Sequence, residues 1–86
     1  MPAISQDLRS PGPAVDAFAI TPSDTVNYTQ GIARGLYIGG AGNVVLVTPQ
    51  DNVVTFTGVL VGTVLNVCSK RINATLTTAT NLVGLM

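Results

Sequence analysis

A glycine-rich stretch, GLYIGGAGNVVLV at residues 35–47, is the first place in this sequence where residue types and spacing could do chemistry. Glycine-rich loops bind phosphate when they lie between a strand and a helix whose N-terminus faces the anion. Here GGAGN is followed by the run VVLV at residues 44–47, which is too β-branched to open a helix. We therefore expect these glycines to supply positive φ angles in a hairpin that joins strands at 36–38 and 44–48.

Residue types suited to catalysis or metal binding are sparse. The sequence has no His and no Glu, and its four Asp residues stand singly, so no metal site is expected. Cys68 has no His to generate a thiolate, and in a predicted strand it is expected to be a small buried side chain. Lys70 and Arg71 are adjacent and point to opposite faces of a strand, so they do not form one basic patch. We expect no catalytic residue, no cofactor and no enzymatic activity.

Tyr37 leaves two interpretations open. It lies between Gly35 and Gly39, where its ring could stack on a sugar or pack on the flat surface of a glycine-containing neighbouring strand. The packing interpretation is the more common one for a strand tyrosine. The sugar-stacking interpretation would make the protein a carbohydrate-binding module.

Composition predicts association between copies of the chain. The 86 residues are 47% hydrophobic and 9% charged, more apolar surface than a small core can bury. One cysteine gives no disulfide within the chain, so oligomerisation is the remaining means of stabilisation. The zero net charge provides no basic face for nucleic acid. The start lacks a signal-peptide pattern and the longest apolar window, 58–68, is too short for a membrane span, so we expect a protein made in the cytoplasm.

The elements that must position these residues fall into two regions. Residues 1–33 hold four of the five prolines and are expected to form an extended N-terminal arm. Within this arm, VDAFAI at 15–20 either docks as a strand on a neighbour or is a frayed terminus; the docking residues would be Val15, Phe18 and Ile20. Residues 34–86 form the β domain.

Short β-branched runs fill the second region, separated by glycines and polar turns such as PQDN at 49–52. They predict an all-β fold, a small antiparallel β-sandwich or barrel. The predicted strands span residues 36–38, 44–48, 53–57, 64–73 and 82–86.

Two of these strands supply the candidate packing residues. The strand at 44–48 is apolar on both faces, Val44 and Leu46 on one and Val45 and Val47 on the other, so it should be covered on both sides, one of them by a neighbouring subunit. The strand at 53–57 alternates, which predicts that Val54 and Phe56 point inward and that Phe56 is the centre of the core.

Five segments together resemble a known family. In order and spacing they are similar to the small head spike base proteins of phage-like gene transfer agents and related tailed phages. One departure is GVLVGT at 58–63, where a proline is expected before the second glycine; it affects the local turn alone. The segments are ITPSDT (20–25), RGLYIGGAGNVVLV (34–47), VVTFTGVLVGTVLNV (53–67), KRI (70–72) and TTATNLVGL (77–85).

The resemblance implies a structural virion protein on the capsid exterior. Such a protein would form a symmetric homo-oligomeric base for a head spike or fibre at five-fold vertices, with a pentamer favoured over a trimer. Its partners would be the major capsid protein and a spike or fibre protein. The alternatives are a trimeric capsid cement, or decoration, protein and a carbohydrate-binding host-adhesion module. The family brings no catalytic residue.

Overall fold

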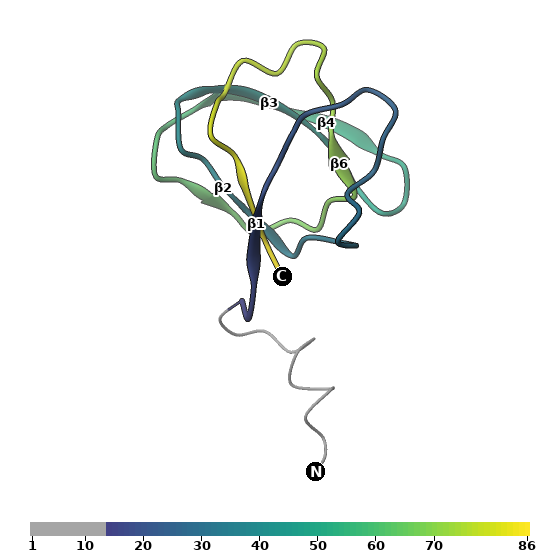
Figure 1. Cartoon of the computed structure of the whole chain (residues 1–86). Coiled ribbons are helices and arrows are strands. Elements are labelled where there is room, and N and C mark those ends of the chain that lie inside the picture. The colour runs from purple at the N-terminus through teal and green to yellow at the C-terminus, as the bar shows by residue number, and fades with distance from the viewer. Residues whose placement is uncertain (1–13) are drawn as a thin grey trace.

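The computed structural model describes residues 14–86, which form two antiparallel β-sheets around one core (Figure 1). None of these residues is helical, so this part of the chain has no helix long and apolar enough to cross a membrane. The all-β prediction is confirmed. The strands are β1 Ala17–Ala19, β2 Gly35–Tyr37, β3 Gly42–Val47, β4 Val53–Val59, β5 Val64–Leu65, β6 Arg71–Ile72 and β7 Val83–Leu85.

The first sheet brings both ends of the described chain together. Its order is β1-β7-β2-β5, so β7 lies between β1 and β2. Ala17 pairs with Leu85 and Ala19 with Val83, and the Val15 amide donates a hydrogen bond to the Met86 carbonyl at 2.6 Å. The strand expected within VDAFAI is therefore present, but its partner is β7 of the same chain and not a neighbouring subunit or the capsid. Residues 17–20 thus belong to the β-sheet structure, whereas residues 1–13 of the expected arm lie outside the described part.

The second sheet, in the order β4-β3-β6, contains the hairpin predicted around PQDN. The Asp51 amide donates to the Thr48 carbonyl and the Thr48 amide donates to the Asn52 carbonyl, both at 2.9 Å. Asp51 has a φ of 68°, in the left-handed region that Asp tolerates better than most residues. The prediction of a turn here is confirmed.

The expected hairpin at GGAGN is wrong, because β2 and β3 belong to different sheets. The segment instead crosses from one sheet to the other, close against residues 78–81. Gly40 forms a β-bridge with Thr80, and a Cβ atom at Gly42 would lie 2.6 Å from the Ala79 nitrogen. Gly42 has a positive φ angle of 156°, as expected, whereas Gly39 and Gly40 do not. These glycines are needed because the backbones approach too closely for a side chain.

The single strand expected at 64–73 is also wrong. It is divided into β5 and β6, which lie in different sheets, and the chain between them crosses the gap. Ser69 is fully buried, and its backbone forms a bridge with Ala33. Cys68 was expected to be buried in a strand. It is exposed and lies in the crossing segment, directly before this bridge.

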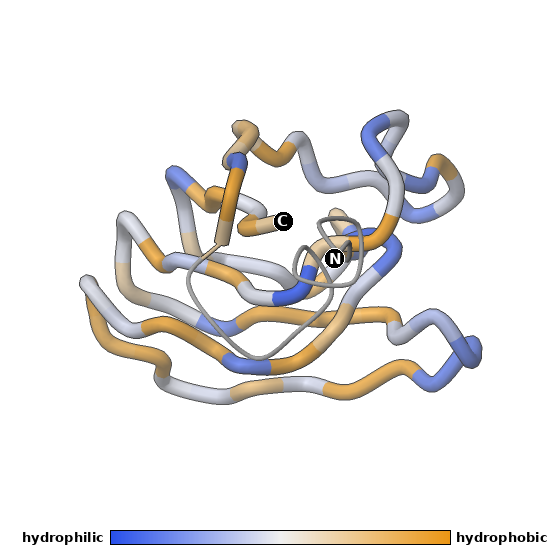
Figure 2. The backbone as a smooth tube through the Cα atoms, turned by 90° about the horizontal axis from the view of Figure 1, so that it is seen from below, coloured by the Kyte–Doolittle hydropathy of each residue, from blue (hydrophilic) through white to orange (hydrophobic). Residues whose placement is uncertain are grey.

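The core lies between the two sheets. Leu36, Ile38, Leu46 and Ile72 are fully buried at its centre, joined by Ile20 and Leu82. Figure 2 shows these apolar segments along the strands, with hydrophilic residues gathered in the turns.

Two predictions about β3 and β4 need correction. Val45 and Val47 are 5% and 1% exposed within the single chain, so no neighbouring subunit is required to cover the second face of β3. Phe56 is half-buried against the core cluster and is not its centre, and Val54 is exposed. The reason is that β4 is an edge strand of its sheet, where the inward face is covered only in part.

Candidate interaction surfaces

Residues 14–86 contain no group of three or more His, Cys, Asp or Glu side chains that could hold a metal ion. Lys70 forms an ion pair with Asp51 in the β3–β4 turn, and this hydrogen bond, aided by the lysine charge, lowers the pKa of the Asp51 carboxyl. Arg71 donates hydrogen bonds to the Oδ1 atoms of Asn27 and Asn73 at 3.0 and 3.1 Å. The two adjacent cations therefore have separate partners, as expected from their opposite directions.

The predicted packing residues do not form a free surface. Val44 and Leu46 are in the core cluster, and Val45 and Val47 are buried. Of the three expected docking residues, Phe18 packs against the core and Ile20 is buried in it, whereas Val15 is exposed. The surfaces available to a partner therefore consist of other residues.

One such surface is the turn between β4 and β5, which we name the apolar tip and define as Leu60 and Val61. Their side chains are 71% and 63% exposed. The Thr63 amide donates to the Leu60 carbonyl at 3.2 Å, and Gly62 has a φ of 85°, features typical of a type II turn. Val61 is the residue where a proline was expected, and the turn forms without it.

The apolar tip is anchored to the body of the protein. The Gly62 amide donates to the Ile38 carbonyl at 2.7 Å, and the Ile38 amide donates to the Thr63 carbonyl at 2.9 Å. Tyr37 and Val64, directly paired across β2 and β5, extend the exposed apolar surface beside the tip. The register partners of Tyr37 are Val64 and Val83, neither of which is a glycine.

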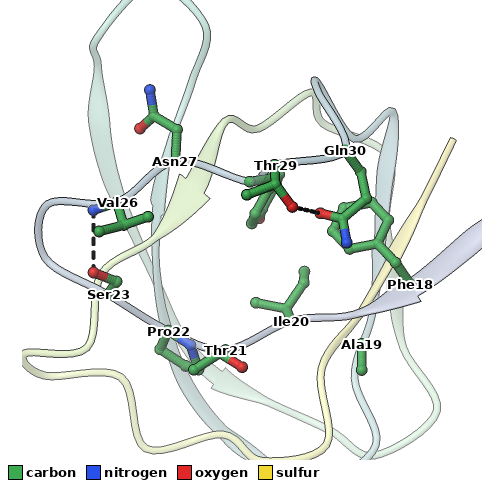
Figure 3. A pocket seen from close by; sticks show the side chains of 11 residues that line it. Phe18, Ala19, Ile20, Thr21, Pro22, Ser23, Val26, Asn27, Thr29 and Gln30 are labelled. Carbon is green, nitrogen blue, oxygen red and sulfur yellow. Dashed lines mark hydrogen bonds between the residues drawn. The ribbon is translucent and has the colours of Figure 1, made fainter.

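A second surface is an open pocket of about 460 Å³ lined by residues 18–23 and 26–30, which we name the loop pocket (Figure 3). Figure 3 shows Ile20 and Val26 pointing into it from opposite sides. Its apolar walls are Phe18, Ile20, Val26 and Tyr28, and its polar groups come from residues such as Ser23 and Thr29. None of the described residues lining it is charged. The pocket is therefore suited to an apolar, uncharged group.

Tyr28 fixes the inner wall of the loop pocket. Its hydroxyl shares a 3.0 Å hydrogen bond with the buried Ser69 hydroxyl, and its amide donates to the Lys70 carbonyl at 2.9 Å. Its ring meets the Phe18 ring edge-on, with centroids 5.1 Å apart. Burial raises the pKa of the Tyr28 hydroxyl, so this group stays a neutral hydrogen-bonding partner.

Ser23 and Asp24 hold the outer part of the loop. The Ser23 hydroxyl accepts hydrogen bonds from the amides of Thr25 and Val26 at 3.3 and 3.1 Å. The Asp24 carboxylate accepts from the Thr75 hydroxyl at 2.6 Å and from the Thr75 amide at 2.9 Å. These two hydrogen bonds lower the pKa of the Asp24 carboxyl, and the bond from the Thr75 hydroxyl has the larger effect. The loop is thus a shaped structure tied to a segment 51 positions away.

The Asp24–Thr75 contact predicts a pH dependence. Because the folded protein lowers the pKa of Asp24, the contact is fully present above the ordinary aspartate value, about 3.9, and is lost as the pH falls through the lowered value. In an NMR titration we expect the Thr75 amide signal to shift with a midpoint below that value, and the shift to disappear in Asp24→Ala. A midpoint at or above the ordinary value would contradict the contact.

The sequence did not reveal the loop pocket, because its walls come from a segment expected to be an arm. The available signal was the apolar set Phe18, Ile20 and Tyr28 within a polar stretch, together with the turn chemistry of Ser23 and Asp24. The apolar tip was visible as Leu60 and Val61 beside Gly62, but its exposure was not predicted.

Comparisons with known proteins give a match among solved structures. No protein family model matches the sequence, and no curated protein matches it. Among solved structures, the chain is similar to a protein in the "Capsid of native GTA particle computed with C5 symmetry", where GTA denotes a gene transfer agent. The two chains are 35% identical, the match covers 100% of each, and the TM-score is 0.79.

Proposed function

The chain belongs to the same family as that protein of the gene transfer agent capsid, and from this membership we propose that it is a structural virion protein on the capsid exterior. It forms a symmetric homo-oligomeric base, a pentamer at five-fold vertices, on which a head spike or fibre sits. The observation that carries this proposal is the match over the whole of both chains, in a particle computed with C5 symmetry.

The surface of the domain supports a role in assembly. Exposed apolar side chains are spread over β4, the apolar tip and β5, among them Val53, Val54 and Val64. Burial of such surface stabilises association by about 25 cal/mol per Å². In addition, β4 is a seven-residue edge strand, VVTFTGV, with no charged residue and no proline. Edge strands of this kind associate readily with other chains. The mechanism is therefore adhesion, with the major capsid protein and a spike or fibre protein as partners and without catalysis.

Capsids assembled without this protein provide the test. Purified protein is added to them and located by electron cryo-microscopy without imposed symmetry. We expect new density on the exterior at the five-fold vertices. Density at three-fold positions would instead favour a trimeric cement protein. Absence of binding at saturating concentration, together with binding on a glycan array, would favour the host-adhesion module and overturn the proposal.

A further inference from the structure

We propose that neighbouring subunits of the ring contact each other by insertion of the apolar tip of one copy into the loop pocket of the next. This inference rests on the proposed homo-oligomer and names the surfaces that build it. The occupant of the pocket is thus a second copy of this chain.

The apolar tip is exposed and has a fixed conformation, two properties that favour its insertion into a pocket. Leu60 and Val61 are adjacent, exposed, and fixed in the turn that joins β4 of one sheet to β5 of the other, by the hydrogen bonds of Gly62 and Thr63 to Ile38. A tip that is already ordered loses little conformational entropy on binding. Large apolar side chains presented in this way serve as interface anchors.

The loop pocket matches the tip in chemistry. Its walls combine apolar side chains with uncharged polar groups, so the insertion of Leu60 and Val61 buries no unpaired charge. Its frame is set before binding, by the Tyr28–Ser69 and Asp24–Thr75 hydrogen bonds. A charged or strongly polar ligand would find no ion-pair partner in it.

The positions of the two surfaces favour a ring. The turn after β4 lies at one side of the domain and the loop of residues 20–30 at the opposite side, as Figures 1 and 2 both show. A tip therefore cannot reach the pocket of its own chain. Contacts between two different surfaces of identical subunits are heterologous, and such contacts build cyclic rings when the rotation closes. A ring of this kind is compatible with the C5 symmetry used for the related particle.

Further apolar surface adjoins both partners. Tyr37 and Val64 are exposed beside the tip, and Val26 is exposed at the pocket. A stable interface buries about 1,200–2,000 Å² in total, more than two side chains can supply. The tip is thus the anchor at the centre of a larger contact, to which these neighbours contribute.

Three single substitutions test the contact. Leu60→Asp changes the tip, Val26→Asp changes the pocket, and Leu76→Asp is the control, because Leu76 is 75% exposed and belongs to neither surface. Leu76 also has a φ of 71°, which Asp tolerates better than Leu. All three positions are exposed, so circular dichroism melts should show folded proteins. By sedimentation velocity we expect each of the first two variants to weaken the contact at least about 30-fold and the control to assemble like the wild type.

Mixing the two defective variants gives the decisive result. Leu60→Asp retains an intact pocket and Val26→Asp retains an intact tip, so one productive contact forms between them. Their complex cannot extend, because the remaining tip and pocket are both defective. Native mass spectrometry of an isotope-labelled mixture should therefore show a heterodimer and no ring.

Other outcomes separate this inference from the proposed function. Folded variants that form normal rings but no longer bind capsids would make the tip a capsid contact and overturn the inference alone. Two monomeric variants whose mixture gives no heterodimer, or gives complete rings, would also overturn it, as would a wild type that decorates capsids only as a monomer. Rings that depend on the tip but do not bind capsids would uphold the inference and refute the capsid role.

Discussion

Truncation of Leu46 to alanine is expected to lower the free energy of unfolding by about 3–5 kcal/mol, because the side chain is fully buried at the centre of the core. A domain of this size has a total stability of about 4–13 kcal/mol, so the variant should lose a large fraction of its stability. Urea unfolding followed by circular dichroism measures the difference.

Phe56→Ala is the matched comparison. Phe56 pairs in register with Val44 on the same hairpin, but it is only half-buried at an edge strand. We expect a loss of about 1–2 kcal/mol, below the range for a buried phenylalanine. Equal losses for the two variants would mean that the core is centred nearer to β4 than the structure shows.

Deletion of residues 1–20 is expected to remove cooperative folding. It takes away β1, the partner of β7, and with it Phe18, whose ring covers Gly84 so closely that a Cβ atom there would lie 2.6 Å from it. Loss of Ile20 alone should cost about 2–5 kcal/mol, a large part of the total stability. Circular dichroism melts should show a sloping, non-cooperative transition.

Deletion of residues 1–13 is the control, because it leaves every contact described above in place. We expect its melting curve to match that of the full chain. A truncated protein lacking residues 1–20 that still melts cooperatively would show that residues 21–86 fold without β1, and would contradict this expectation.

Local sequence patterns predicted where the strands lie better than they predicted which strands pair with each other. The β3–β4 hairpin was predictable because residues 44–47 and 53–57 are β-branched and PQDN supplies turn chemistry between them. The crossing at GGAGN was not, because glycine suits both a positive φ angle and a close backbone approach. Only the position of Thr80, some 40 residues away, decides between them.

The interaction surfaces depend even more on distant residues. The loop of residues 20–30 is shaped by Thr75 and Ser69, and neither contact is visible in local sequence. Similarly, the two apolar faces of β3 indicated an oligomer because one face was expected to need a neighbouring subunit to cover it. In the structure the chain covers both faces itself. Half of the large exposed apolar residues in the described part of the chain lie instead in β4, β5 and the turn between them, namely Val53, Val54, Leu60, Val61 and Val64.

The position of β7 between β1 and β2 has a consequence for biosynthesis. A ribosome makes β1 among the first elements and β7 last, and β1 has no other strand partner in the described sheet. While residues 20–82 are being synthesised, β1 has no β7 to form hydrogen bonds with, and Phe18 has no Gly84 to pack against. The first sheet therefore cannot close on the nascent chain before residues 83–85 have emerged. Until then the apolar strands remain accessible to chaperones and to other nascent chains.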